Sequence, residues 1–240
     1  MVNINYLKNP FNYIGGKYKL LPQILPLFPK KINKFVDLFG GGGEVSLNVN
    51  AKQVVYNDKC EPLVNIFRNL DSKFVDEVKE MIDTYKLNKF SKQEFLNLRS
   101  YYNTNLKDNL DRENAVVLYC LITHAFNYQI AFNKNREFNM PSGASRSYFS
   151  KSLEDKLVKY IEAIDKKNIG FYSSDFHNLN LDSPEFNDTF YYCDPPYLIT
   201  VGGYERDYFC KWSEDYEREL LNLLDIINSK GGKFALSNVT

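Results

Sequence analysis

The tetrapeptide Asp194-Pro195-Pro196-Tyr197 places a carboxylate, two prolines and an aromatic ring directly after the apolar run 189–193. That run predicts a buried strand, and open α/β sheets bind ligands at the carboxyl ends of their strands. The prolines predict a stiff, extended turn with free carbonyls beside the carboxylate. Two acceptors facing one point suit an exocyclic amino group, and the Tyr197 ring can lie against the heterocycle that carries it. The alternative is an ordinary strand end with Asp194 as a turn residue.

Four glycines, Gly40-Gly41-Gly42-Gly43, follow Phe39 between a predicted strand and a predicted helix. Glycines permit a tight turn and let backbone N–H groups approach a ligand closely. The spacing is not GxGxxG and no GK[ST] follows, so a phosphate cradle is poorly supported. A smaller ligand with a carboxylate and a ribose fits this loop as well.

Asp58 ends the next predicted strand, where an acid typically accepts hydrogen bonds from ribose hydroxyls. Its alternative role is to cap the helix that follows. The glycine loop and this acid together favour a nucleoside-containing cofactor. Near the N-terminus, Tyr13 precedes a Gly-Gly turn and Lys17, whose ammonium can pair with a carboxylate.

These residues need a scaffold that brings strand ends together, and the pattern of the chain predicts one. Strands are expected over 34–39 and 53–58, with helices over 44–50 and 62–70, which implies a parallel sheet with right-handed crossovers. The strand pattern resumes over 169–172, 189–193 and 233–237, with a helix over 213–228 before the last strand.

The middle of the chain carries helical periodicity. Helices are predicted over 72–85, 91–103, 112–126 and 151–164. Two short strands, 128–132 and 137–140, are predicted around a polar turn at 133–136. We therefore expect one α/β domain with a mostly helical insertion between about residues 71 and 170.

Composition narrows the class of protein. The 240 residues are 44% hydrophobic and 15% aromatic, with no run that could span a bilayer and no secretory signal, which predicts a cytoplasmic globular protein. The four cysteines are scattered, and neither His124 nor His177 has metal-ligand spacing, so we expect reduced thiols and no metal site.

The formal net charge is zero, so the overall charge of the chain does not indicate a nucleic-acid partner. Between residues 131 and 151 one local basic stretch has Glu137 as its only acid; its bases are Lys134, Arg136, Arg146 and Lys151. An ordinary solvated loop explains that charge equally well.

Taken in order, six segments resemble the Dam-like group of adenine-N6 DNA methyltransferases. They are Tyr13-Ile14-Gly15-Gly16-Lys17, Phe35-Val36-Asp37-Leu38-Phe39-Gly40-Gly41-Gly42, Asn57-Asp58, Glu137-Phe138-Asn139-Met140-Pro141, Asp194-Pro195-Pro196-Tyr197 and Leu236-Ser237-Asn238. They cover nearly the whole chain, and the ordered set is far more specific than any single motif.

The resemblance implies a Rossmann-like sheet that binds S-adenosyl-L-methionine, with a helical target-recognition insertion and no metal. Residues 1–70 and 171–240 would form the catalytic domain and 71–170 the insertion with its hairpin. Cofactor contacts carried over from the group are Tyr13, Lys17, Asp37, Phe39, Gly40, Gly41, Asp58 and Asp194. The catalytic motif would be Asp194, Pro195, Pro196 and Tyr197.

The implied reaction is methyl transfer to N6 of an adenine in double-stranded DNA. Asp194 and the Pro195 carbonyl would hold the N6 hydrogens, so that the nitrogen lone pair faces the sulfonium methyl for one in-line step. The base must be flipped out of the duplex, with Tyr197 stacking on it. A cognate restriction endonuclease system is the expected partner. The competing hypotheses are a cofactor-binding but inactive remnant that only binds DNA or a partner, and methylation of RNA or protein.

The predicted hairpin aligns with the recognition element of the group. Residues expected to contact DNA are Tyr128, Gln129, Asn133, Lys134 and Arg136. Members that methylate GATC carry a guanine-reading arginine where this chain has Ala131, which argues against GATC. Members usually continue past Asn238 with a further helix and strand. The expectation is therefore either a truncated product or completion of the sheet by another segment.

Overall fold

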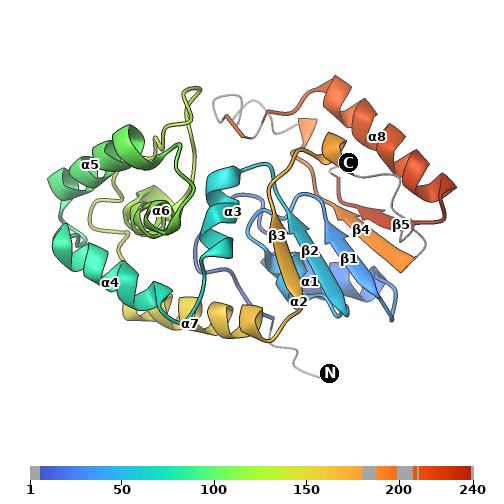
Figure 1. Cartoon of the computed structure of the whole chain (residues 1–240), viewed down its shortest axis with the longest axis horizontal. Helices are drawn as coiled ribbons and strands as arrows, with labels where there is room; N and C mark the ends of the chain where they lie inside the picture. The colour runs from blue at the N-terminus through green and yellow to red at the C-terminus, as the bar shows by residue number, and fades with distance from the viewer. Residues whose placement is uncertain (1–5, 180–187, 199–207, 210, 239–240) are drawn as a thin grey trace.

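The computed structural model describes residues 6–179, 188–198, 208–209 and 211–238. Within them, five strands form one parallel sheet in the order β3-β2-β1-β4-β5 (Figure 1). The strands are β1 (Lys34–Asp37), β2 (Gln53–Asn57), β3 (Ile169–Tyr172), β4 (Thr189–Cys193) and β5 (Lys233–Leu236). The predicted parallel sheet is confirmed, with β1 and β2 ending one or two residues early.

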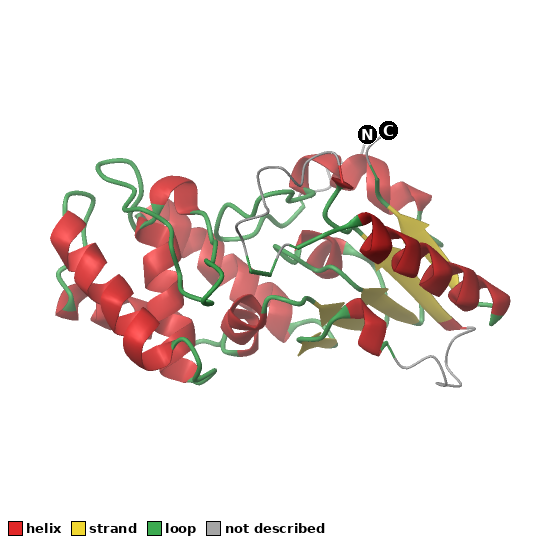
Figure 2. Ribbon diagram, turned by 90° about the horizontal axis from the view of Figure 1, so that it is seen from above, coloured by secondary structure: helices red, strands yellow, loops and turns green. Residues whose placement is uncertain are grey.

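Helices cover both faces of the sheet (Figure 2), and alternate side chains of each strand explain why. Phe35, Phe190 and Tyr192 face the short N-terminal helices and α2 (Glu44–Asn48). Val36, Tyr191 and Cys193 face α8 (Glu214–Ser229). The N-terminal stretch after Lys17 forms η1 (Tyr18–Leu20), α1 (Leu21–Ile24) and η2 (Leu25–Leu27).

The insertion forms a helical part beside the sheet (Figures 1 and 2). It contains α4 (Phe74–Thr84), α5 (Lys92–Tyr101), the π-helix η3 (Tyr102–Leu106), α6 (Arg112–His124) and α7 (Lys151–Asp165). Helix α6 is buried from Asn114 to its end, and α3 (Glu61–Arg68) packs against it from the sheet side. One hydrophobic cluster therefore runs through the helical part and the sheet edge.

The two strands predicted at 128–132 and 137–140 were wrong. In the 126–141 loop, the described backbone makes a single antiparallel bridge, between Phe132 and Phe138, after a short 3-10 turn, η4 (Phe126–Tyr128). Asn127, Tyr128 and Arg136 have positive φ, which no regular strand contains. The Asn133 side chain also accepts the N–H groups of residues 135 and 137, so these donors are not available to a ladder.

The order in which strands are added to the sheet changes side at β1. The chain moves from β1 to β2 on one side, and β4 later pairs with β1 on the other. This topological switch point leaves a crevice at the carboxyl ends of β1 and β4, which is where such sheets bind ligands. Among the described helices, none is long and apolar enough to cross a membrane.

Candidate active site

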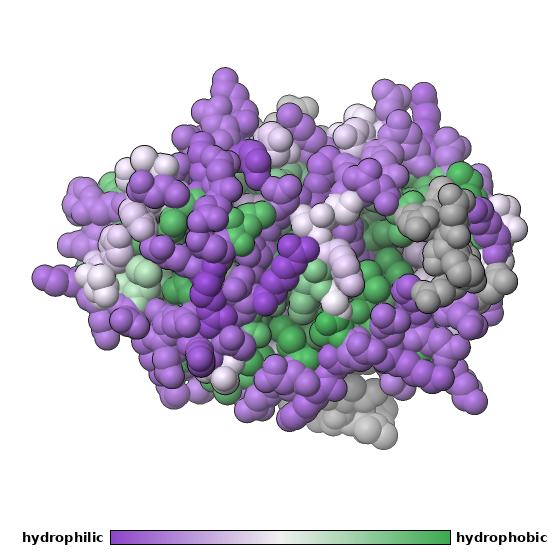
Figure 3. All heavy atoms as spheres, viewed as in Figure 1, coloured by the Kyte–Doolittle hydropathy of each residue, from purple (hydrophilic) through white to green (hydrophobic). Residues whose placement is uncertain are grey.

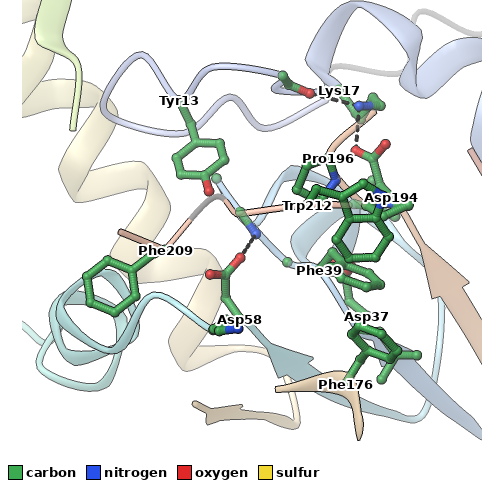
Figure 4. Close-up of a pocket in the computed structure, with 18 of the residues that line it drawn as sticks. Tyr13, Lys17, Asp37, Phe39, Asp58, Phe176, Asp194, Pro196, Phe209 and Trp212 are labelled. Atoms are coloured by element: carbon green, nitrogen blue, oxygen red, sulfur yellow. Dashed lines mark hydrogen bonds and ion pairs between the residues drawn. The ribbon is translucent and has the colours of Figure 1, made fainter. Parts of the chain in front are cut away.

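A cavity opens at this switch point. The loops that follow β1, β2, β3 and β4 all contribute to it, together with the N-terminal segment. All eight predicted cofactor residues and all four residues of the predicted catalytic motif line it. Figure 4 shows Tyr13, Asp58 and Phe209 toward one end, and Lys17, Asp194 and Pro196 toward the other.

Asp194 is the carboxylate at the end of β4, and both of its oxygens have partners. The Tyr197 hydroxyl donates to Oδ1 at 2.6 Å, and the Lys17 ammonium forms an ion pair with Oδ2 (Figure 4). Burial raises the pKa of Asp194, although Lys17 and Tyr197 oppose the shift. Each carboxylate oxygen has a second lone pair, so the group can still accept a ligand N–H.

Lys17 reaches Asp194 because its own segment is anchored on α2. Glu44, the first residue of α2, is buried and accepts the backbone N–H of Tyr18 at 2.9 Å. Its other oxygen accepts from the Asn9 side chain at 3.0 Å. The Lys17 ammonium also donates to the Gly15 carbonyl at 2.8 Å, so the Gly-Gly turn and the lysine are fixed together.

The glycine loop after β1 has no room for side chains. A Cβ on Gly40 would lie 2.2 Å from the buried Tyr56 ring, and one on Gly41 would lie 2.7 Å from Tyr13. Two tyrosine hydroxyls hold the loop, since Tyr56 donates to the Gly41 carbonyl at 2.7 Å and Tyr160 of α7 donates to the Gly42 carbonyl at 3.0 Å. The insertion thus supports the loop directly.

Asp58 lies between the cavity and the start of α3, but it is not the capping residue of that helix, because Cys60 is the N-cap and receives no side-chain cap bond. Its Oδ1 accepts from the Cys60 N–H at 2.8 Å, which fixes the turn before α3. Its Oδ2 accepts from the Gly41 N–H at 2.8 Å and lies at the cavity wall (Figure 4). Burial raises its pKa, and the two N–H donors lower it again.

Asp37 is the most deeply buried carboxyl group of the cavity. It is 1% exposed, and burial raises its pKa to about 7 against a hydrogen bond from Ser46, with Asp194 adding to the rise. Ser46 donates to Oδ2 at 2.7 Å, whereas the buried Oδ1 has no hydrogen-bond partner. A buried acceptor without a donor is rare, so a ligand donor at this oxygen would satisfy it.

Sequence reasoning missed several residues of the cavity. Asp175 and Phe176 follow β3 as Asp58 follows β2, and the rule applied to strand ends would have found them. Phe39 packs against Phe176 and against Trp212, with ring centroids 5.6 Å apart in both pairs. Phe209 and Trp212 lie in a part of the sequence where no periodic pattern points to the cavity.

The five residues predicted to contact DNA lie outside the cavity lining. The Tyr128 hydroxyl donates to the Arg146 carbonyl at 3.2 Å, and Lys134 is exposed. Asn133 uses its side chain to hold its own turn, and Gln129 is half-buried. Arg136 forms an ion pair with Glu61.

The 126–141 loop is nevertheless joined to the cavity through Asn12. The Asn12 backbone N–H donates to the Tyr128 carbonyl at 3.2 Å, and its side chain donates to the Asn127 carbonyl at 3.1 Å. Because the next residue is Tyr13, this contact places the loop one residue away from the end of the cavity that Tyr13, Asp58 and Phe209 line.

The sheet order, the glycine loop and the carboxylate at the switch point define the class as a Rossmann-like methyltransferase. The chain belongs to the D12 class N6 adenine-specific DNA methyltransferase family, whose model matches residues 13–240. The resemblance inferred from the ordered motifs is therefore confirmed.

Relatives identify the kind of methyltransferase that the chain is similar to. Type II methyltransferase M.FokI of Planomicrobium okeanokoites is 46% identical, over 98% of this chain and 36% of that protein. Modification methylase StsI of Streptococcus sanguinis is 42% identical over the same shares. Type II methyltransferase M1.LlaDCHI of Lactococcus lactis subsp. cremoris is 29% identical, over 95% of this chain and 80% of that protein. The chain spans about a third of the length of the first two relatives.

Proposed function

We propose that this chain methylates N6 of a specific adenine in double-stranded DNA, with S-adenosyl-L-methionine as the methyl donor. The observation that carries the proposal is the Asp194 carboxylate at the β1–β4 switch point, in one cavity with the glycine loop and Asp58. Family membership supports the adenine and DNA specificity.

The residues present fit this cofactor. Asp58 offers carboxylate oxygens to ribose hydroxyls, and the unpartnered Asp37 Oδ1 offers an acceptor to an ammonium group. The loop from Gly40 to Gly42 admits close approach because it lacks side chains. When bound, S-adenosyl-L-methionine supplies an electrophilic methyl group on a positively charged sulfur.

The chain's own task is to prepare the amino nitrogen. The N6 lone pair of adenine is delocalised into the ring, so acceptors must draw its hydrogens away from the ring plane. The Asp194 carboxylate and the Pro195 carbonyl provide these acceptors, and Lys17 and Tyr197 fix the carboxylate in place. Alignment of this kind contributes much of the rate of a one-step transfer.

DNA would approach over the 126–141 loop and the mouth of the cavity. A base inside a duplex cannot reach Asp194, so the adenine must be flipped out and stacked on Tyr197. We expect the exposed Lys134 to contact phosphate, and Tyr128 and Gln129 to contact bases. Since Ala131 stands where GATC-specific members carry arginine, we expect a different target sequence.

The names of the relatives support a role as the modification half of a restriction–modification system, acting on DNA in the cytoplasm. A plasmid that carries the gene should then resist one particular restriction endonuclease. Sensitivity to every endonuclease tested, despite methylated adenine in the plasmid, would contradict that role.

The reaction is tested by incubating the purified chain with radiolabelled S-adenosyl-L-methionine and DNA that lacks adenine methylation, followed by digestion to nucleosides. Label is expected in N6-methyladenine and nowhere else. Asp194→Ala is the control, which should abolish transfer and retain DNA binding. If the wild-type chain binds the cofactor and transfers no label, the proposed activity is wrong.

A further inference from the structure

Arg136 already has partners within the protein, although its side chain is 34% exposed. Nη2 donates to Glu61 Oε2 at 2.5 Å. The guanidinium carbon lies 5.9 Å from the Tyr208 ring centroid and 6.0 Å from that of Phe209, within the range of cation–π contacts. Nε is buried, so this part of the side chain is not in contact with solvent.

The backbone at Arg136 is held in an unfavourable conformation. Its φ is +62°, a region that side chains with a Cβ rarely adopt. The Arg136 N–H donates to the Asn133 carbonyl at 2.9 Å, and the Asn133 side chain binds the N–H groups on either side of Arg136. This turn fixes the direction of the arginine, and strained positions of this kind cluster at functional sites.

One partner of Arg136, Phe209, lines the cavity, and the other two, Tyr208 and Glu61, lie close in the chain to residues that line it. Phe209 lines the cavity and stacks edge-on against Phe132 of the 126–141 loop, at 5.3 Å between centroids. The Tyr208 N–H donates to the Phe132 carbonyl at 3.0 Å. Glu61 begins α3, three residues after Asp58. Figure 4 shows Phe209 and Asp58 at the same end of the cavity.

We propose that Arg136 is a positioning residue of the cofactor cavity, which clamps Phe209 and the start of α3 to the 126–141 loop. The inference rests on the proposed function, because it takes the cavity to be the site for S-adenosyl-L-methionine. It gives Arg136 a different role from the DNA contact that the sequence suggested. The charge and the planar shape of the guanidinium both matter, since it pairs with a carboxylate and covers two rings.

Two measurements separate this role from a phosphate contact. Trp212 is the chain's single tryptophan and lines the cavity, so its fluorescence can report the Kd for S-adenosyl-L-methionine without any catalysis. The slope of log K for duplex DNA against log salt concentration reports phosphate contacts, at about 0.9 for each one lost.

Arg136→Gly is the main variant, because glycine accepts the positive φ and removes only the side chain. We expect its Kd for the cofactor to rise about tenfold, with an unchanged salt slope for DNA. Arg136→Lys keeps the charge but lacks the planar guanidinium that covers the two rings. Its Kd for the cofactor should lie between those of the wild-type chain and Arg136→Gly. Lys134→Ala, two residues away and exposed, is the matched control: its salt slope should fall by about one and its cofactor Kd should not change.

Glu61→Gln tests the clamp from the other side without altering the loop. If both residues act through one contact, the double variant should bind the cofactor no more weakly than Arg136→Gly alone, rather than showing the product of the two losses. Thermal unfolding of each variant checks that the fold is retained.

The inference is overturned if Arg136→Gly binds the cofactor like the wild-type chain, whether or not its salt slope falls. Independent, multiplied losses in the double variant would also overturn it. Failure of the wild-type chain itself to bind S-adenosyl-L-methionine would instead refute the proposed function, and the inference with it.

Discussion

The Asp194 carboxylate shows how much the position of one side chain depends on its neighbours. Asp194 keeps its place through two donors that come from very different parts of the chain, Lys17 and Tyr197. The sequence identified Asp194 and Tyr197 as parts of one motif. It identified Lys17 as a cation that can pair with a carboxylate. It did not indicate that this carboxylate is Asp194, because the two residues are brought together only by the fold.

Tyr197→Phe removes the hydroxyl that binds Asp194 Oδ1 and keeps the ring that would stack on adenine. A hydrogen bond to a charged group contributes about 1.5–3 kcal/mol, so we expect kcat to fall by at least about tenfold. The affinity for DNA should not change. Single-turnover methyl transfer and a competition binding assay measure the two effects, and wild-type kcat would contradict the positioning role of the hydroxyl.

Asp37 should make stability depend on pH in an unusual direction. Burial raises its pKa from 3.8 to about 7, so the folded chain binds this proton more tightly than the unfolded chain does. Its contribution to stability is therefore complete below the unfolded pKa and is lost as the pH rises toward about 7. The loss should be about 1 kcal/mol per pH unit across that window.

Asp37→Asn removes the titrating group and serves as the reference for this prediction. Urea unfolding at a series of pH values gives the free energy of unfolding of both chains. The wild-type value minus the variant value should fall between about pH 4 and about pH 7 and then level off. A difference that is independent of pH would show that Asp37 is ionised throughout.

At the scale of elements, periodicity predicted nearly every strand and long helix to within one or two residues. The failures lie where side chains override the backbone pattern. Residues 128–132 and 137–140 read as strands, yet the Asn133 amide and the positive φ at Arg136 replace pairing with a fixed turn. Phe209, which lines the cavity, was also missed, because its position depends on a contact with Phe132 that no local sequence pattern encodes.

Gly40→Ala tests the fit between the glycine loop and β2. The added Cβ would lie 2.2 Å from the Tyr56 ring, which is fully buried and cannot move aside freely. Overpacking of this kind costs about 1–3 kcal/mol, and we expect cofactor affinity to fall with it. Gly15→Ala controls for the clash alone: its φ of +82° strains an alanine, but no atom lies within 4 Å of the added Cβ, so the Tyr56 region should be unchanged. Equal stability of Gly40→Ala and wild type would contradict the close fit.

At the scale of the whole molecule, one hydrophobic cluster extends from the helical part to the edge of the sheet, and two further clusters cover the faces of the sheet. Residues such as Phe95 and Tyr102 from the insertion belong to the same cluster as Tyr56 and Phe67 beside the sheet. Hydrophilic side chains cover most of the face in Figure 3, with hydrophobic atoms visible between them near its middle. The parts that the sequence separates into insertion and catalytic segments are therefore packed together.

We expect both parts to unfold in one transition. Trp212 fluorescence reports on the sheet side, and far-UV circular dichroism is dominated by helices, with most of the described α-helical residues in α4 to α7 of the insertion. The two urea transitions should have the same midpoint, as in cooperative single domains. An earlier midpoint by circular dichroism would show that the helical part unfolds on its own.

The strand order also determines when the sheet can be completed during synthesis on the ribosome. β1 lies at the centre of the sheet, but its partner β4 is translated about 150 residues later. At about 5–20 residues per second, the ribosome leaves β1 with one unpaired edge for on the order of ten seconds. During that interval Phe35 lacks the rings of Phe190 and Tyr192, and an open strand edge beside exposed aromatic surface invites pairing with other chains. The nascent protein should therefore depend on chaperones until β4 emerges, and the two halves of its cavity first meet at that moment.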